Sequence, residues 1–226
     1  SWNWYCDMFL SGADAVANEN GYRLMTILSD IDNFECNVDL FIKLRFAGIV
    51  IVSTEILTIG HELPNVIPTV FVNQNNCKGP NIMSSDYEDS RVVMEYLIGL
   101  GHKKIAFIKG REDSPHTIER YRAYCDVMRE NKLEINPGWI GKSGNWNPHI
   151  AYEETKRILK SDERPTAIVA SDAMAPGIYD AIRDVGLRIP YDVSVVGYDN
   201  QELSEILNPQ LTTVSFPLYE MGQRAI

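Results

Sequence analysis

The carboxylate of Asp199 comes shortly after an apolar run in the segment VSVVGYDN. Residues 193–196 are nearly all apolar, which is typical of a strand buried on both faces of a parallel sheet. The run ends at Gly197, so Asp199 lies just past the carboxyl end of the predicted strand, where open α/β sheets bind their ligands. Asp199 is therefore either a ligand-binding carboxylate or a turn residue, because Asp is also common in turns.

Two further side chains have types that suit a binding site. Arg120 lies at the start of a predicted helix, where a cation is electrostatically unfavourable. This position indicates that Arg120 has a role other than that of a solvent-exposed surface residue. A guanidinium group binds a carboxylate, a phosphate or a pair of hydroxyls. Trp146 lies in the polar turn Gly-Asn-Trp-Asn-Pro with no obvious core to join. Its face suits the C–H side of a pyranose or a purine ring.

The elements that must position these residues alternate between strand and helix. Helices are predicted over residues 4–20, 35–45, 86–100, 118–132, 149–160, 173–185 and 218–226. Strands are predicted over residues 22–28, 47–52, 69–72, 104–108, 139–142, 166–170, 193–196 and 211–215. This alternation predicts parallel, doubly wound sheets with helices on both faces. The chain begins and ends on a helix, so we expect a first strand upstream and more structure downstream.

Composition limits the classes of function. The chain has 226 residues, enough for two lobes of roughly 100 residues each. Its net charge of -10 disfavours binding to a phosphate backbone by this segment alone. Its apolar runs are too short to span a membrane. The four cysteines have no metal-ligand spacing, and free thiols favour a cytoplasmic location.

Motifs for catalysis are absent from the sequence. There is no nucleophile elbow, no P-loop and no dinucleotide-binding glycine motif. The four histidines are isolated from one another and from the cysteines. We therefore predict no enzyme activity, no metal site and no cofactor.

Five segments carry a more specific pattern. They are EYLIGLGHKKIAFIKG (95–110), RYRAY (120–124), RPTAIVASDAMAPGIYDAIRDVGLRIPYDVSVVGYDN (164–200), PQLTTV (209–214) and FPLYEMGQRAI (216–226). Together they resemble the effector-binding region of the lactose repressor/galactose repressor (LacI/GalR) family of bacterial transcription regulators. The resemblance covers the whole chain in order and is most specific in the second half.

This resemblance implies a periplasmic-binding-protein-like fold of type I, incomplete at both ends. Two α/β lobes, joined by three crossing strands, would hold the effector in a cleft. Residues 1–109 with 216–226 would form one lobe and residues 110–215 the other. Crossings would fall near 109–111, near 215–218 and beyond Ile226. The DNA-binding helix-turn-helix of the family would lie upstream, outside this chain.

The resemblance also implies ligand-binding residues. Asp199, Arg120 and Trp146 match contact positions of the family. Ser171 stands where the family often has Asn, and Asp172 beside it is a ligand group or a helix cap. The remaining candidates are Tyr5, Cys6, Asp86, Thr54 and Ile56.

The expected function is that of the effector-binding and dimerisation region of a LacI-type repressor. The partners would be a sugar or sugar derivative (a purine being the second choice), a second copy of the chain, and operator DNA through the upstream domain. Ligand binding would shift the lobe orientation and so the operator affinity. The alternative is a periplasmic sugar-binding protein of a transporter, and a third class is an enzyme on a similar fold.

Overall fold

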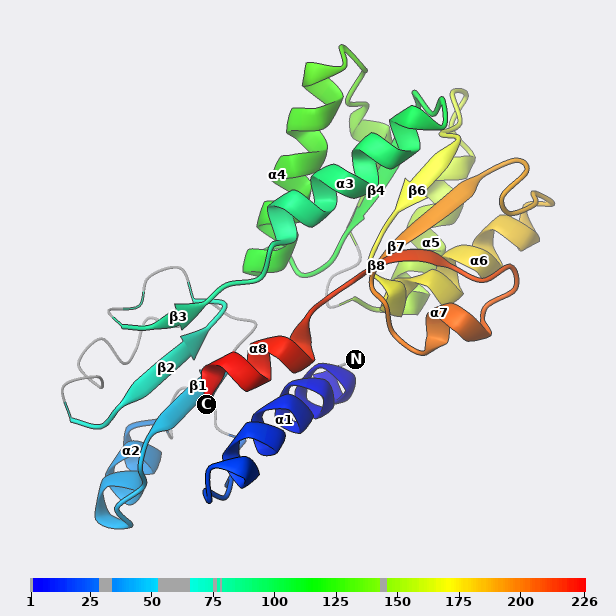
Figure 1. Cartoon of the computed structure of the whole chain (residues 1–226). Coiled ribbons are helices and arrows are strands. Elements are labelled where there is room, and N and C mark those ends of the chain that lie inside the picture. The colour runs from blue at the N-terminus through cyan, green and yellow to red at the C-terminus, as the bar shows by residue number, and fades with distance from the viewer. Residues whose placement is uncertain (1, 29–33, 53–65, 75–76, 78, 143–145) are drawn as a thin grey trace. The chain divides into compact units, whose positions relative to one another are not determined.

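The computed structural model describes residues 2–28, 34–52, 66–74, 77, 79–142 and 146–226 (Figure 1). The chain divides into two compact units. Residues 85–216 form one, which we call the central unit, and residues 2–84 with 217–226 form the other, the terminal unit. Among the residues described, no helix is both long and apolar enough to cross a membrane.

The central unit is built on a five-stranded parallel sheet in the order β5-β4-β6-β7-β8. Its strands are β4 (Ile105–Lys109), β5 (Ile140–Lys142), β6 (Ala167–Val169), β7 (Ser194–Asp199) and β8 (Thr212–Ser215). Its helices are α3 (Asp86–Gly99), α4 (Pro115–Glu130), α5 (Pro148–Leu159), α6 (Ala175–Asp184) and the short α7 (Leu203–Ile206), with 3-10 turns at Pro137–Trp139 and Asp172–Met174. Helix α3 packs against α4, and α5 against α6.

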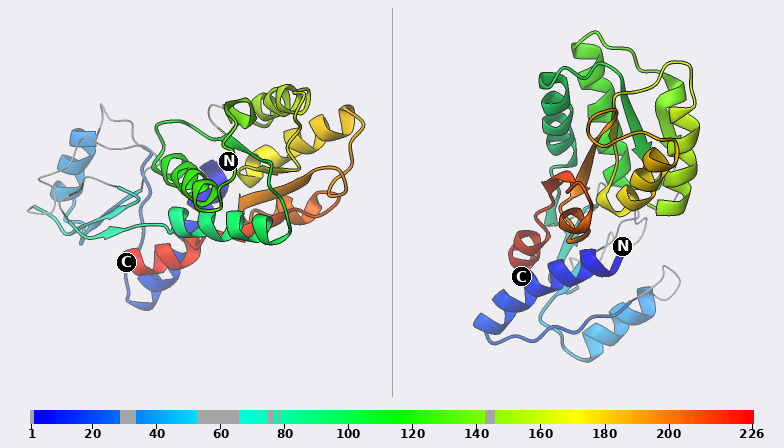
Figure 2. Two further views of the ribbon diagram at one scale, coloured as in Figure 1. Left: turned by 90° about the horizontal axis from the view of Figure 1, so that it is seen from above. Right: turned by 90° about the vertical axis from the view of Figure 1, so that its right-hand side faces the viewer.

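Both faces of this sheet are buried because its side chains alternate between two cores. On β4, Ile105 and Phe107 join the core formed with α3 and α4, whereas Ala106 and Ile108 join the core formed with α5 and α6. This is the period of two expected of a strand. The two helix pairs cover opposite faces of the sheet (Figure 2). The predicted doubly wound α/β class is therefore confirmed.

The predicted lobe boundary at residue 109 is wrong. Strand β4 lies inside the five-stranded sheet of the central unit, and the division falls between Ser84 and Ser85. The loop after β4 begins with Gly110 and leads to Pro115, the first residue of α4, so it connects β4 to α4 within one unit. The second predicted crossing, near 215–218, coincides with the division after Phe216.

The terminal unit has a three-stranded parallel sheet in the order β1-β2-β3. Its elements are α1 (Trp2–Glu19), α2 (Phe34–Lys43), β1 (Ile49–Val52), β2 (Thr69–Val72), β3 (Asn81–Ile82) and α8 (Leu218–Ala225). Strand β3 was not predicted from the sequence. Helices α1 and α8 lie side by side, so the two ends of the chain meet in this unit (Figure 1).

Residues 22–28, predicted as a strand, form no ladder with any described strand. Leu28 is 83% exposed and Met25 54% exposed. A strand requires a neighbour for its backbone groups, and sequence pattern alone does not reveal whether one is available.

On α3, Val93, Met94 and Leu97 are buried, whereas Val92, Tyr96 and Leu100 are at least half exposed. The helix therefore carries apolar side chains beyond its buried face. Gly21, Gly101 and Gly186 follow the ends of α1, α3 and α6 with φ angles of 78°, 93° and 78°, a conformation that glycine adopts without strain.

Helices α1 and α8 approach closely at Gly12, and we predict that Gly12→Ala destabilises the terminal unit. A Cβ atom there would overlap the backbone carbonyl of Tyr219, which cannot rotate away. Overpacking of this kind costs roughly 1–3 kcal/mol. Gly99 is the matched control because it also lies on a helix but faces open space, so Gly99→Ala should stabilise by about 0.5–1 kcal/mol. Equal unfolding midpoints for both variants in a urea titration would contradict this packing.

Candidate ligand-binding site at the strand ends

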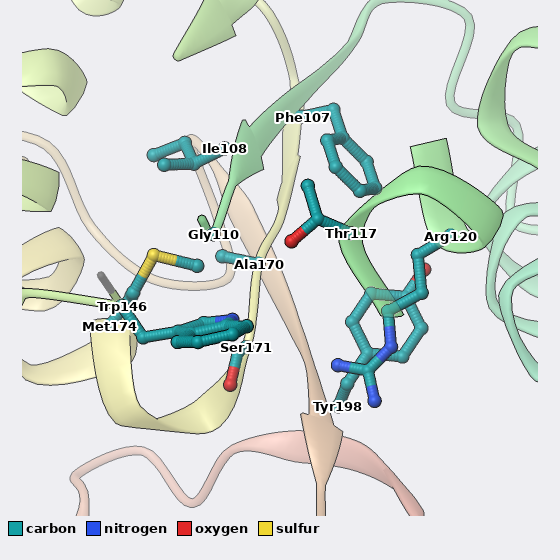
Figure 3. Close-up of a pocket in the computed structure, with 10 residues that line it drawn as sticks. All are labelled: Phe107, Ile108, Gly110, Thr117, Arg120, Trp146, Ala170, Ser171, Met174 and Tyr198. Atoms are coloured by element: carbon teal, nitrogen blue, oxygen red, sulfur yellow. The ribbon is translucent and has the colours of Figure 1, made fainter. Parts of the chain in front are cut away.

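A pocket lies at the carboxyl ends of β4, β6 and β7, the neighbouring central strands of the central unit (Figure 3). The empty space in and around it is about 250 Å³, a volume that includes open solvent. Its lining residues are Phe107, Ile108, Gly110, Thr117, Arg120, Trp146, Ala170, Ser171, Met174 and Tyr198. The carboxyl ends of parallel strands are the usual ligand-binding edge of an open α/β sheet.

Arg120 is the buried cation of this site, with a relative exposure of 7%. Its Nε donates to Asp86 Oδ1 at 2.6 Å, and its Nη2 donates to Asp199 Oδ1 at 3.0 Å. Burial alone would lower the pKa of Arg120, but the charges of Asp86 and Asp199 raise it above its ordinary value. The guanidinium also lies 4.6 Å from the ring centroid of Tyr198, a cation–π distance. Arg120 is thus a fixed cation held between two carboxylates.

Asp199 is held through both carboxylate oxygens. Oδ1 accepts from Arg120, while Oδ2 accepts from Ser171 Oγ at 2.6 Å and from Gln201 Nε2 at 3.3 Å. The backbone of Asp199 has a φ of 110°, and that of Asn200 a φ of 53°. Non-glycine residues in such conformations cost about 1–3 kcal/mol and occur where the surroundings enforce them, often at functional sites. The strand end is therefore a constrained turn that fixes the direction of the Asp199 carboxylate.

Asp172 is fully buried and is not among the pocket-lining residues. Its Oδ1 accepts from Thr213 Oγ1 at 2.7 Å, and its Oδ2 accepts from the backbone N–H of Gln201 at 2.9 Å. Gly197 is required beside it, because a Cβ at that position would overlap the carboxylate. Burial raises the pKa of Asp172 to about 7, and the charge of Asp199 also raises it. Asp172 links the end of β6 to β8 and to the turn that carries Asp199.

Asp86, the other predicted acid, accepts a hydrogen bond from Arg120 and does not line the pocket either. Its Oδ2 lies 2.6 Å from His116 Nδ1, and the imidazole packs edge-to-face on Phe216 at a centroid distance of 5.4 Å. His116 was not predicted as a site residue. It stands one helical turn before Arg120 on α4, and this spacing was the available signal.

Trp146 forms the wall of the pocket opposite Arg120 (Figure 3). Its indole packs directly on Gly110, where a Cβ atom would overlap the ring. Its backbone has a φ of 50°, a further strained position at this edge. The indole is therefore held at the pocket by a glycine that leaves room for it.

Thr117 contributes a hydroxyl group to the space between these two walls (Figure 3). The residue is 5% exposed, and its Oγ1 has no hydrogen-bond partner among the described residues. A buried hydroxyl without a partner carries a penalty of about 1–3 kcal/mol, which a ligand group would relieve. Thr117 was not predicted, although it lies three residues before Arg120 on the same helix.

The predicted site residues therefore fall into separate groups. Arg120, Trp146 and Ser171 line one pocket, and Asp199 is bonded to two of them. Tyr5 and Cys6 belong to the terminal unit, where Tyr5 is buried and its hydroxyl accepts from Asn73 Nδ2 at 2.8 Å. Burial raises the pKa of the half-buried Cys6 thiol.

Thr54 and Ile56 lie outside the described residues. Within the described ranges, no cluster of His, Cys, Asp and Glu side chains is arranged to hold a metal ion.

Comparison with known proteins connects this geometry to a family. Residues 94–226, more than half of the chain, match the model of a periplasmic binding protein-like domain. The chain is 30% identical over 232 aligned residues to the HTH-type transcriptional repressor PurR of Histophilus somni, covering 98% of this chain and 69% of the relative. It is 31% identical over 214 residues to PurR of Pasteurella multocida, covering 91% of this chain and 64% of that relative. A LacI-family regulatory protein from Chloroflexus aggregans superposes with a TM-score of 0.89 at 28% identity, over 97% of this chain and 81% of that one.

The fold and the strand-end pocket are those of an α/β protein of the periplasmic-binding-protein-like class. Within that class, the chain belongs to the LacI/GalR family of transcriptional regulators and corresponds to their effector-binding domain. The chain spans just under two thirds of the length of the Pasteurella relative.

Proposed function

We propose that this chain senses a small ring-shaped effector for a transcriptional repressor, and that the strand-end pocket binds it. The observation that carries the proposal is the pairing of an aromatic wall, Trp146, with a fixed polar wall, Arg120 and Ser171, both of which are hydrogen-bonded to Asp199. The unpartnered hydroxyl of Thr117 lies between them. An apolar face with a few convergent polar groups is the usual design of a small-molecule site.

Two classes of effector suit such a pocket. A sugar would place its C–H face on Trp146 and its hydroxyls toward Arg120 and Asp199, and these residues are the basis for expecting a carbohydrate. A purine would stack on the same indole and offer ring nitrogens to the same polar groups. The relatives named PurR favour the purine. Both classes therefore belong in one ligand screen.

The regulatory step would be a population shift. An effector that binds one conformation better than another moves the equilibrium toward it, by no more than its difference in affinity for the two. In a homodimer, that shift would change the spacing of two upstream DNA-binding modules and hence the affinity for operator DNA. Relatives described as repressors favour this role, and a cytoplasmic location, over that of a transporter component or an enzyme.

A thermal-shift screen over uncharged sugars, sugar derivatives and nucleobases tests the proposal. One class should raise the melting temperature, because a ligand at 100 times its Kd adds about 2.7 kcal/mol to the stability of the bound state. Gly110→Ala should weaken that binding roughly tenfold, about 1.4 kcal/mol, because the new methyl group displaces the Trp146 indole.

Gly99→Ala is the matched control for Gly110→Ala, since it adds the same methyl group in open space and should bind the effector like the wild type. The proposal fails if no compound of either class shifts the transition of a cooperatively folding sample. It also fails at this pocket if Gly110→Ala binds the active compound with unchanged affinity.

A further inference from the structure

The charge of the pocket is set by Arg120 and its two acidic partners. Of the described residues that line it, Arg120 alone is a Lys, Arg or His. Its guanidinium carries one positive charge, whereas Asp86 and Asp199 each present a carboxylate at hydrogen-bond distance. The three groups together have no surplus of positive charge.

These contacts also occupy donors on one of the two guanidinium edges that can bind an anion through a pair of N–H groups. Two parallel N–H···O bonds from adjacent nitrogens are the usual way in which Arg holds a carboxylate or phosphate. Here Nε points at Asp86 and Nη2 at Asp199. The remaining N–H groups can still donate to an uncharged oxygen or nitrogen, and one face of the group is covered by Tyr198.

An anion at the remaining edge would be attracted by Arg120 and repelled by the carboxylates of Asp86 and Asp199, which both contact the guanidinium group. The repulsion offsets the attraction, so the cost of removing the anion from water is left uncompensated.

Other cations near the ends of β4 and β5 do not line the pocket and already have partners. The contacts are Arg111 Nε to Asp113 Oδ1 at 2.7 Å, Lys142 Nζ to Glu112 Oε1 at 3.9 Å, and Lys109 Nζ at 3.9 Å from the ring centroid of Tyr121. They supply no further positive group to the pocket wall.

We infer that the pocket accepts an uncharged effector and rejects anionic ones, such as sugar phosphates, nucleotides and carboxylate-bearing compounds. This inference rests on the proposed function and narrows it to a neutral sugar or a neutral nucleobase. Asp199 acts here as the charge filter, since its carboxylate contacts the guanidinium of the pocket-lining Arg120 and offsets its charge.

Inorganic phosphate tests the filter without knowledge of the effector. At constant ionic strength, phosphate in place of chloride should leave the melting temperature of the wild type unchanged. Asp199→Asn removes one carboxylate from Arg120, so this variant should gain a saturable rise of a few degrees with phosphate. Saturable stabilisation of the wild type, or no gain in a cooperatively folding Asp199→Asn sample, would overturn the inference.

Matched pairs of ligands provide a second measurement, which stands even if Asp199→Asn does not fold. Glucose with glucose 6-phosphate and adenine with adenosine monophosphate represent the two sources of a neutral ring. By calorimetry, the anionic member of any pair that binds should be at least tenfold weaker than the neutral one. An anionic member that binds as tightly overturns the charge filter. If none of the four compounds binds and phosphate does not raise the melting temperature of the wild type, only the proposed function is contradicted.

Discussion

Arg120→Ala should lower the free energy of unfolding of the central unit by about 3–5 kcal/mol, the usual cost of removing one partner from a buried ion pair. The loss follows from what remains behind. Asp86 and Asp199 would keep their burial without the cation that both contact at 2.6 and 3.0 Å. Effector binding should be lost in the same variant. Arg120→Lys should be intermediate, because one ammonium group cannot span two carboxylates with a planar fork.

Arg122→Ala is the matched control on the same helix. The side chain of Arg122 is 56% exposed and pairs with Glu119 at the surface. Exposed pairs of this kind contribute about 0–1 kcal/mol. Hydrogen exchange in β4, β6 and β7 would follow the central unit separately from the terminal unit. If the backbone amides of these strands exchange equally slowly in both variants, Arg120 does not stabilise the central unit.

The elements of the fold were predictable because their signals are local. Alternation of apolar runs and helical periodicity identified the strands of the central unit, and glycines marked the ends of α1, α3 and α6. The prediction failed where the outcome depends on partners distant in sequence. Residues 22–28 have the composition of a strand but form no ladder with a described strand. Likewise, β4 was assigned to the wrong unit because only its pairing with β5 and β6 decides its membership.

The candidate site shows the same division. Asp199 was identified from its place after an apolar run, and Trp146 from its isolation in a polar turn. The partners that fix the acids are invisible in the sequence: Gln201 contacts Asp199 and Asp172 from the strained turn after β7, and Thr213 contacts Asp172 from β8. Asp172 comes shortly after β6 and Asp199 ends β7, yet Asp172 is fully buried whereas the side chain of Asp199 is 14% exposed. Strand-end position therefore predicted which residues gather there, but not which of them face a ligand.

The buried acid Asp172 should make stability fall as pH rises from about 4 to about 7. Burial raises its pKa in the folded chain to about 7 from an ordinary value of 3.8. Between those values, the folded state keeps a proton that the unfolded state has lost, so the folded state is favoured at the acidic end of the window. Each pKa unit corresponds to about 1.4 kcal/mol, which sets an upper limit of roughly 4 kcal/mol for this one group. Above about pH 7 its contribution is constant.

Asp172→Asn isolates this effect from other titrating groups. Its amide can accept from the N–H of Gln201 and donate to the hydroxyl of Thr213, so both links are kept without a charge. The variant should therefore be more stable than the wild type at pH 8 and similar to it at pH 4, as measured by urea denaturation. Asp192→Asn is the control of opposite sign, because Arg188 lowers the pKa of Asp192 and its contribution is lost only as pH falls. An equal difference in unfolding free energy between wild type and Asp172→Asn at pH 4 and at pH 8 would contradict the raised pKa. Asp172 would then be ionised across that range and would add one negative charge to the carboxylates at this strand end.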